Sequence, residues 1–158
     1  MNTSFRCSRS EQGEQCTRGT ALKQKDIQPE LAGAILIVEP DADLYSRIAA
    51  QLACTGLAAI PAINALEALS ILDRRTDIGL VFTAVNMPGP LDGVALAVRI
   101  HRERPDLAIV ITSGVVSLRQ SSLPPRCRFL SKPYEPEEAI KCFRFLLGVN
   151  TPVSTVRI

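Results

Sequence analysis

Four short apolar runs in this sequence are each followed by a segment that contains polar or charged side chains. These segments are Glu39 to Asp43, Ala84 to Asn86, Thr112-Ser113 and Lys132-Pro133. They supply carboxylates, an amide, hydroxyls and an ammonium group, which together can accept and donate hydrogen bonds to a charged ligand. The side chains can act together only if the fold brings them to one place.

The elements that would position these segments alternate between strand and helix. Runs of Ala, Ile, Leu and Val predict buried strands, and apolar residues spaced every three or four positions predict amphipathic helices. The second helix is expected to follow an N-cap at Asn64 and to bury Leu66, Leu69 and Leu72. The predicted strands span residues 34–38, 58–62, 79–84, 108–112 and 129–131, and the predicted helices span residues 41–55, 64–72, 92–103 and 136–147.

This alternation predicts an α/β fold in which a parallel sheet carries helices on both faces. Binding sites of such sheets lie beyond the carboxyl ends of the strands. All four polar segments follow predicted strands, so we expect them along one edge of the sheet. Residues 115–126 have only weak periodicity, and a helix there would be short or irregular.

The composition argues against several other classes of protein. A net charge of +2 over 158 residues gives no electrostatic footprint for nucleic acid, and five Phe, two Tyr and no Trp offer no base-stacking platform. No stretch approaches the roughly 20 apolar residues of a membrane span. Five cysteines and a single histidine lack the usual zinc spacings, and the odd cysteine count favours a reducing cytoplasm. We therefore expect a cytoplasmic protein with no nucleic-acid or membrane partner.

The sequence divides into three parts by pattern. Residues 1–32 mix both charge signs with Ser, Thr, Gln and Gly, and show no helical or strand period, so they are interpreted as a mobile leader or the product of a mistaken start codon. Residues 33–148 hold all the periodic segments and form one domain. Residues 149–158 are interpreted as a short tail.

The four strand ends carry motifs that resemble those of the bacterial response-regulator receiver domain. The motifs are Val38-Glu39-Pro40-Asp41, Asn86-Met87-Pro88-Gly89 with Asp92-Gly93, Ile111-Thr112-Ser113-Gly114, and Phe129-Leu130-Ser131-Lys132-Pro133. Each motif alone is weak, but four in this order are specific. The resemblance covers about residues 33 to 148 and implies a flavodoxin-like, doubly wound sheet of five parallel strands in the order 2-1-3-4-5.

The resemblance also implies a phosphoryl-transfer site, from which this chain departs at two positions. In the family, two acids after the first strand hold Mg²⁺, an Asp ending the third strand accepts a phosphoryl group, and a Thr or Ser and a Lys bind the phosphoryl oxygens. Glu39 falls on the first acidic position, whereas Pro40 falls on the second and Ala84 on the acceptor position. Thr112 and Lys132 fall on the positions that bind phosphoryl oxygens.

A methyl group cannot be phosphorylated or ligate a metal, and no neighbour of Ala84 is expected to replace the acid. The hydroxyl of Thr83 should face the opposite side of the strand, because successive side chains alternate. Asn86 belongs to the relic phosphoryl site, but an amide is not a nucleophile of this kind. Asp41 stands beside Glu39 at the acidic pocket and is expected to cap the first helix. We therefore predict no phosphorylation and no cofactor, with weak Mg²⁺ binding at Glu39 left open.

The remaining site residues allow several interpretations. Thr112 and Lys132 can be relic phosphoryl ligands, or merely a strand end and a solvated cation, or Lys132 can pair with Glu39. We favour the pair, because Glu39 would otherwise lack a partner. Phe129 occupies the position of the family's switch aromatic, and without a phosphoryl group it is expected to pack in the core. The resemblance implies a cis bond before Pro133.

The sequence therefore predicts a stand-alone, receiver-like protein of two-component or phosphorelay signalling that is not an enzyme. Its partner would be a histidine kinase, a phosphotransferase or another signalling protein, and a homodimer stays open. Two alternatives remain: a phosphorylatable receiver with a non-standard acceptor, and a flavodoxin-like binder of a nucleotide or flavin. The expected contact surface joins the last helix to the fifth strand, with Arg126, Arg128, Tyr134, Lys141 and Arg144 as candidates.

Overall fold

A computed structural model describes residues 33–115 and 117–149 of the chain. The strands are β1 (Ala34–Val38), β2 (Ala59–Ala62), β3 (Ile78–Ala84), β4 (Ala108–Ser113) and β5 (Cys127–Ser131). The helices are α1 (Ala42–Ala53), α2 (Ala65–Arg74), α3 (Gly93–Glu103) and α4 (Pro136–Leu147), with a 3-10 turn, η1 (Gln120–Ser122), between β4 and β5. The predicted strands and helices are all present. The predicted leader and all but the first residue of the predicted tail lie outside the described residues.

The strands form one parallel sheet in the order β2-β1-β3-β4-β5, as the resemblance implied. The register pairs Val38 of β1 with Thr83 of β3, and Ala84 of β3 with Thr112 of β4. On the other side of β4, Thr112 pairs with Leu130 of β5. The carboxyl ends of β1, β3, β4 and β5 therefore follow one another along a single edge of the sheet.

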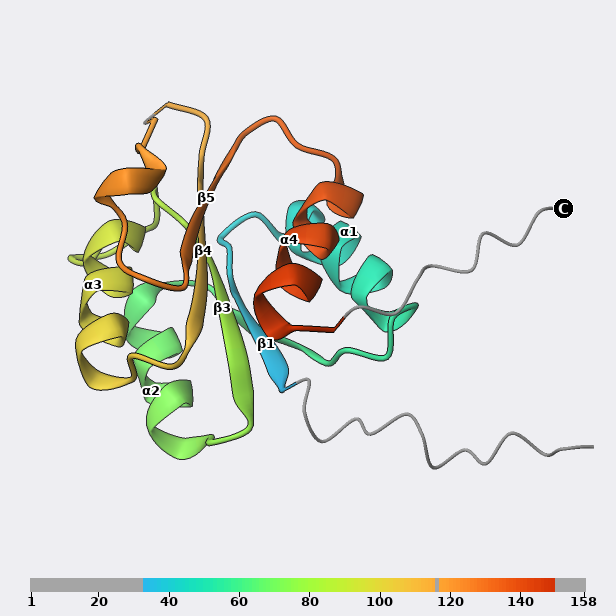
Figure 1. The fold of residues 1–158 in the computed structure, drawn as a ribbon, viewed down its shortest axis with the longest axis horizontal. Helices are drawn as coiled ribbons and strands as arrows, with labels where there is room; N and C mark the ends of the chain where they lie inside the picture. The colour runs from blue at the N-terminus through green and yellow to red at the C-terminus, as the bar shows by residue number, and fades with distance from the viewer. Residues whose placement is uncertain (1–32, 116, 150–158) are drawn as a thin grey trace, which may run out of the picture.

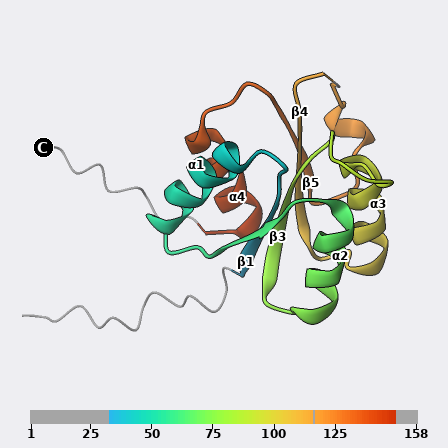
Figure 2. The same cartoon turned by 180° about the vertical axis from the view of Figure 1, so that it is seen from behind.

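Helices cover both faces of this sheet, with α2 and α3 on one side and α1 and α4 on the other (Figures 1 and 2). Each face has its own apolar core, because successive strand side chains point to opposite sides. Val81 of β3 belongs to the core under α2 and α3, whereas Phe82 belongs to the core under α1 and α4. Within the described ranges, no helix has the length and apolar character needed to cross a bilayer.

Side-chain caps fix where the helices begin. The Oδ1 atoms of Asp41, Asn64 and Asp92 accept hydrogen bonds from backbone N–H groups in the first turns of α1, α2 and α3. In α4, Glu135 and Glu138 form a reciprocal capping box, and Pro136 occupies the first turn, where no N–H is needed. The loops that follow β1 and β3 therefore end at defined points close to the strand ends.

One prediction about α2 is wrong. Leu66 was expected on the buried stripe with Leu69 and Leu72, but its side chain is 56% exposed. Residues spaced by three drift around a helix that has 3.6 residues per turn, so positions 66 and 72 lie far apart on its surface. Ala65 and Ala68 complete the buried stripe instead.

The segment between β4 and β5 contains only the short turn η1, in agreement with its weak periodicity. Gln120 ties this turn to the outer edge of β5. Its Nε2 atom donates to the carbonyl of Cys127 at 2.6 Å, and its Oε1 atom accepts from the N–H of Phe129 at 3.4 Å. One amide thus bonds two backbone groups that a neighbouring strand would otherwise bond.

Candidate functional site

The carboxyl end of β1 carries a buried carboxylate that is already paired. The side chain of Glu39 is 3% exposed, and its Oε2 atom lies 3.1 Å from Nζ of Lys132, which follows β5. Its Oε1 atom accepts a hydrogen bond from the N–H of Asp41 at 3.1 Å. The favoured sequence interpretation, an ion pair between Glu39 and Lys132, is therefore confirmed. Because Lys132 is itself 31% exposed, one end of the pair remains in contact with solvent.

Ala84 ends β3 in the middle of the edge and is 4% exposed. Its carbonyl packs closely against the start of α3, where a Cβ atom on Gly93 would stand only 2.0 Å from the carbonyl oxygen. The next residue, Val85, donates its N–H to the carbonyl of Thr112 at 2.8 Å. The backbone of the acceptor position is thus fixed by α3 and β4, although its side chain is only a methyl group.

The residues near Ala84 lie as the alternation of side chains predicts. The hydroxyl of Thr83 donates to the carbonyl of Ala84 at 3.1 Å and contacts the sulfur of Met87, a residue that packs against the core under α2 and α3. Ala84, like Phe82, belongs to the opposite face of the strand. Asn86 is exposed in the loop that follows. None of these side chains brings a carboxylate to the acceptor position.

Asp41 is the other acid assigned to this pocket from the sequence. Its Oδ1 atom accepts hydrogen bonds from the N–H groups of Asp43 and Leu44, at 2.9 and 3.1 Å, and the residue is exposed. Its role in the structure is the predicted helix cap. The Asp41 carboxylate bonds α1, and the backbone N–H of the same residue bonds Glu39, so its place in an acidic pocket stays a prediction.

Two buried hydroxyl groups lie close together at this edge, and neither bonds any other residue that the structure describes. They belong to Thr112, which is fully buried at the end of β4, and to Tyr134, two residues after Lys132. Burial raises the pKa of Tyr134, and the nearby charge of Glu39 raises it further, while the hydroxyl of Thr112 and the charge of Arg47 act in the opposite direction. The phenol, the threonine hydroxyl and the Glu39 carboxylate are therefore neighbours.

Tyr134 was expected on the contact surface, and the structure buries its hydroxyl and part of its ring. Its ring is half-buried and packs edge-on against Phe82, with ring centroids 6.0 Å apart and an interplanar angle of 88°. Phe82 in turn stacks edge-on with Phe143 of α4 at 5.1 Å. The missed signal was position: Tyr134 directly follows Lys132-Pro133 at the carboxyl end of β5, where a side chain can turn inward.

The remaining site predictions concern β5. Phe129 is partly buried and packs against the core under α2 and α3, as expected for a residue without a switching role. The bond between Lys132 and Pro133 is cis, as the resemblance implied. The N–H of Lys132 donates to the carbonyl of Ser113 at 2.9 Å, which holds the lysine backbone at the end of β4. These contacts position the Lys132 side chain for its bond with Glu39.

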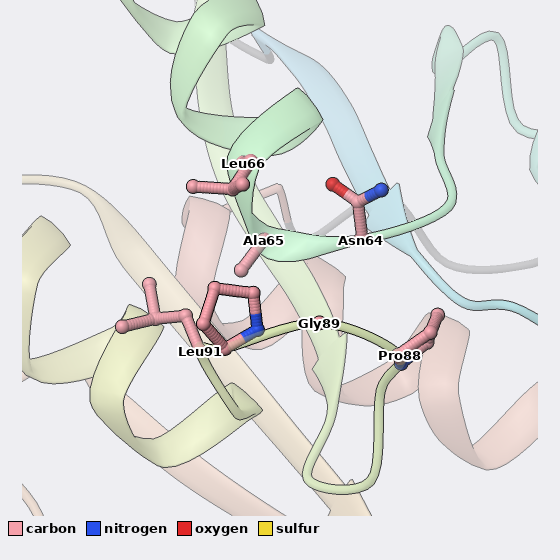
Figure 3. Close-up of a pocket in the computed structure, with 7 residues that line it drawn as sticks. Asn64, Ala65, Leu66, Pro88, Gly89 and Leu91 are labelled. Atoms are coloured by element: carbon pink, nitrogen blue, oxygen red, sulfur yellow. The ribbon is translucent and has the colours of Figure 1, made fainter.

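A separate hollow lies between the start of α2 and the loop that connects β3 to α3. It is lined by Asn64, Ala65, Leu66, Pro88, Gly89, Pro90 and Leu91, and Figure 3 shows the apolar side chains of Leu66 and Leu91 beside it. Its one polar side chain, Asn64, already accepts the N–H of Glu67 at 2.8 Å. The other side chains that line the hollow are apolar.

Comparisons with known proteins agree with this geometry. Residues 35–144 match the family model described as the response regulator receiver domain. The chain belongs to the response regulator receiver family. Members of this family interact with signalling proteins such as histidine kinases.

Several solved structures are similar to this chain. A receiver domain protein from Clostridium thermocellum is 21% identical, with a TM-score of 0.66, over 73% of this chain and 94% of that one. A receiver protein from Sinorhizobium medicae is 25% identical, with a TM-score of 0.67, over 75% and 96% of the two chains. NtrX from Brucella abortus is 29% identical, with a TM-score of 0.65, over 74% of this chain but only 27% of the NtrX chain.

The receiver family's Mg²⁺ ion does not fit the residues present here. Such an ion takes oxygen ligands, mainly from carboxylates. Glu39 is the one carboxylate on the family's acidic positions, and its two oxygens are engaged by Lys132 and by the N–H of Asp41. Pro40 and Ala84 have no side-chain oxygen. In the part of the chain that the structure describes, no three His, Cys, Asp or Glu residues gather where they could hold a metal.

Proposed function

We propose that this receiver domain does not take up a phosphoryl group and acts in two-component signalling through protein contacts alone. The observation that carries the proposal is the methyl group of Ala84 at the acceptor position, with a fixed backbone and no carboxylate from a neighbour to replace it. Phosphoryl transfer to a receiver needs a carboxylate nucleophile and a cation to offset the developing charge. The residues at this edge supply neither a carboxylate at the acceptor position nor the acids that hold Mg²⁺ in the family, and the Lys132 cation bonds Glu39.

The Glu39–Lys132 ion pair supports the same proposal. In the family the lysine binds the phosphoryl group, whereas here its Nζ atom already bonds Glu39 at 3.1 Å. A lysine that joins β5 to β1 holds the edge in one arrangement without any bound anion. Thr112 then has no phosphoryl oxygen to approach, which agrees with Phe129 being packed in the core.

The proposal extends to the protein's setting. In this proposal the domain lacks the phosphoryl acceptor, performs no reaction of its own and transmits its signal by docking. Its partner would be a histidine kinase, a phosphotransferase or another signalling protein, and the site of action would be the cytoplasm. No cofactor takes part in this mode of action.

The test is direct exposure to a phosphoryl donor. The full chain is incubated with acetyl phosphate and Mg²⁺ and its intact mass is measured, beside a variant with Pro40→Asp and Ala84→Asp. We expect no change in the mass of the natural chain and a gain of one phosphoryl group in the variant. A phosphoryl group on the natural chain would overturn the proposal and favour a non-standard acceptor.

A further inference from the structure

The apolar hollow between α2 and the loop that follows β3 has a size that suits one side chain. Leu66 of α2 and Leu91 of the loop line it from these two elements (Figure 3). Its volume of about 50 Å³ is far too small for a nucleotide or a flavin ring. Leu66 is 56% exposed, and Ile63, which directly precedes the lining residue Asn64, is 61% exposed. Apolar side chains that gather on a surface mark a place where another segment binds.

The hollow is preformed, because the elements on both sides of it are held in place. Pro88 and Pro90 each fix one backbone dihedral of the loop. The two ends of the loop are joined, since the N–H of Gly93 donates to the carbonyl of Val85 at 2.9 Å. On the other side, a side-chain cap holds the first turn of α2. A preformed site has little conformational entropy to lose when a segment binds to it.

The loops at this end of the sheet carry acids and no cation. They follow β1, β2 and β3 and span residues 39–43, 63–67 and 85–93, none of which contains a Lys or an Arg. Glu39 pairs with Lys132. The other acids of these loops form no ion pair with any residue that the structure describes; they are Asp41, Asp43, Glu67 and Asp92.

Two of these acids stand at the hollow itself. Glu67 directly follows the lining residue Leu66, and Asp92 directly follows Leu91. The amino termini of the helices offset this charge only in part, because each contributes about half a positive charge. We refer to Glu67 and Asp92 as the acidic rim. A segment that fits the hollow should therefore combine an aliphatic side chain with cations.

A segment of this chain has that composition. Residues 15–25 contain Arg18, Lys23 and Lys25, no Asp or Glu, and a single leucine, Leu22. They precede the described residues, which begin at Gly33, directly before β1. Leu22 lies 11 positions before Gly33. An extended chain of that length spans about 36 Å, roughly twice the length of a five-residue strand such as β1.

We propose that residues 15–25 dock on the hollow of the same chain, with the Leu22 side chain inside it and the two lysines beside the acidic rim. The covalent tether gives the segment an effective concentration of about millimolar, so even a weak contact is populated. A second copy is disfavoured, because a two-fold interface would place the acidic rim against itself. The docked segment covers the loop after β3, and a partner that binds this end of the sheet must displace it.

The test measures backbone motion by NMR in the full ¹⁵N-labelled chain. At low salt we expect amide order parameters above about 0.6 for residues 22–25, and values below that limit in the variant with Lys23→Glu and Lys25→Glu. A matched variant with Arg6→Glu and Arg9→Glu makes the same change in net charge. It should leave the order parameters of residues 22–25 as they are in the natural chain.

Variants of the domain test the other side of the contact. Leu66→Ala removes part of the wall of the hollow and should lower the order parameters of residues 22–25. Val98→Ala, at a position of α3 that is 48% exposed, should not lower them. Raising the NaCl concentration to about 1 M, where the Debye length is about 3 Å, should also free the segment. The amide shift of Leu91 should change whenever the segment leaves.

Several results would overturn the inference. Order parameters below about 0.6 at residues 22–25 of the natural chain would show that the segment does not dock. Equal losses in the two charge-reversed variants, or in Leu66→Ala and Val98→Ala, would show that the contact is not specific to the hollow.

Other occupants have their own signatures. Order parameters that fall on dilution of the protein would assign the contact to a second copy. Low order parameters in the natural chain, with a Leu91 amide that shifts when a Lys-Leu-Lys peptide is added, would assign the hollow to a different protein. None of these outcomes bears on the acetyl phosphate test, because the residues of the acceptor position do not line the hollow.

Discussion

The ends of β1 and β3 and the ends of β4 and β5 lie on the same edge of the sheet, yet they carry different chemistry. On the first half, Pro40 and Ala84 stand where the family has acids, and Glu39 remains. On the second half, Thr112 and Lys132 keep the family's residue types. The lysine has a use without a phosphoryl group, because it pairs with the buried carboxylate of Glu39. The comparison shows that Lys132 has a structural role in the folded domain that does not depend on a phosphoryl group.

The largest effect is expected where α3 packs on the end of β3. Gly93→Ala would place a Cβ atom 2.0 Å from the carbonyl oxygen of Ala84, so backbone must move, and we expect a loss of about 3 kcal/mol in the free energy of unfolding. Gly114→Ala, on the β4 half, meets only the Lys132 Cβ at 3.4 Å and should change stability by less than about 0.5 kcal/mol. Urea denaturation followed by circular dichroism measures both. Equal losses would mean that the two halves are packed alike.

The next effect concerns the ion pair that joins the halves. Lys132→Met would leave the buried carboxylate of Glu39 without its cation, and we expect a loss of about 2 kcal/mol, moderated by the partial exposure of the lysine. Adding Glu39→Gln to the same chain should recover most of that loss. A double-mutant cycle from urea denaturation gives the coupling energy of the pair. A coupling near zero would show that the pair does not hold the edge together.

The smallest expected effect is a difference in stability between valine variants of the two threonines at the edge, Thr112 and Thr83. Thr112→Val removes a buried hydroxyl whose polar neighbour is the Tyr134 hydroxyl, with no bond to any other described residue, so stability should change by less than about 0.5 kcal/mol. Thr83→Val removes a hydroxyl that donates to the carbonyl of Ala84, and should cost about 1 kcal/mol. Thermal unfolding of the two variants is the comparison to make. If Thr112→Val is the more damaging change, its hydroxyl makes a stronger bond in the folded domain than the Thr83 hydroxyl does.

The sequence is sufficient to predict the layers of the fold, because each strand is a short apolar run and Asp41 and Asn64 mark the helix starts. It also predicts the Glu39–Lys132 pair, since the carboxyl ends of parallel strands must meet at one edge. Tyr134 could not be placed in this way. No periodicity follows Pro133, and only the three-dimensional packing against Phe82 turns the ring inward.

Leu66 shows how a sequence pattern can predict the wrong environment for a residue. A spacing of three between leucines satisfies a helical pattern on paper, but the buried stripe of α2 runs through alanines at positions 65 and 68. Small residues give a weak periodic signal, so the pattern favoured the leucines. The contacts of the acids at the start of α4 are equally hidden from sequence, because Glu135 lies near Arg47 and Glu137 accepts a hydrogen bond from Gln51, both on α1.

The most direct test is a crystal structure of the full chain grown with Mg²⁺ and beryllium fluoride, which mimics a phosphoryl group on a carboxylate. We predict a methyl group at position 84, Lys132 on Glu39, and no beryllium or magnesium at this edge. Beryllium fluoride bound to any carboxylate at the edge, with Lys132 turned toward it and away from Glu39, would contradict the proposal that this receiver domain has lost phosphoryl chemistry.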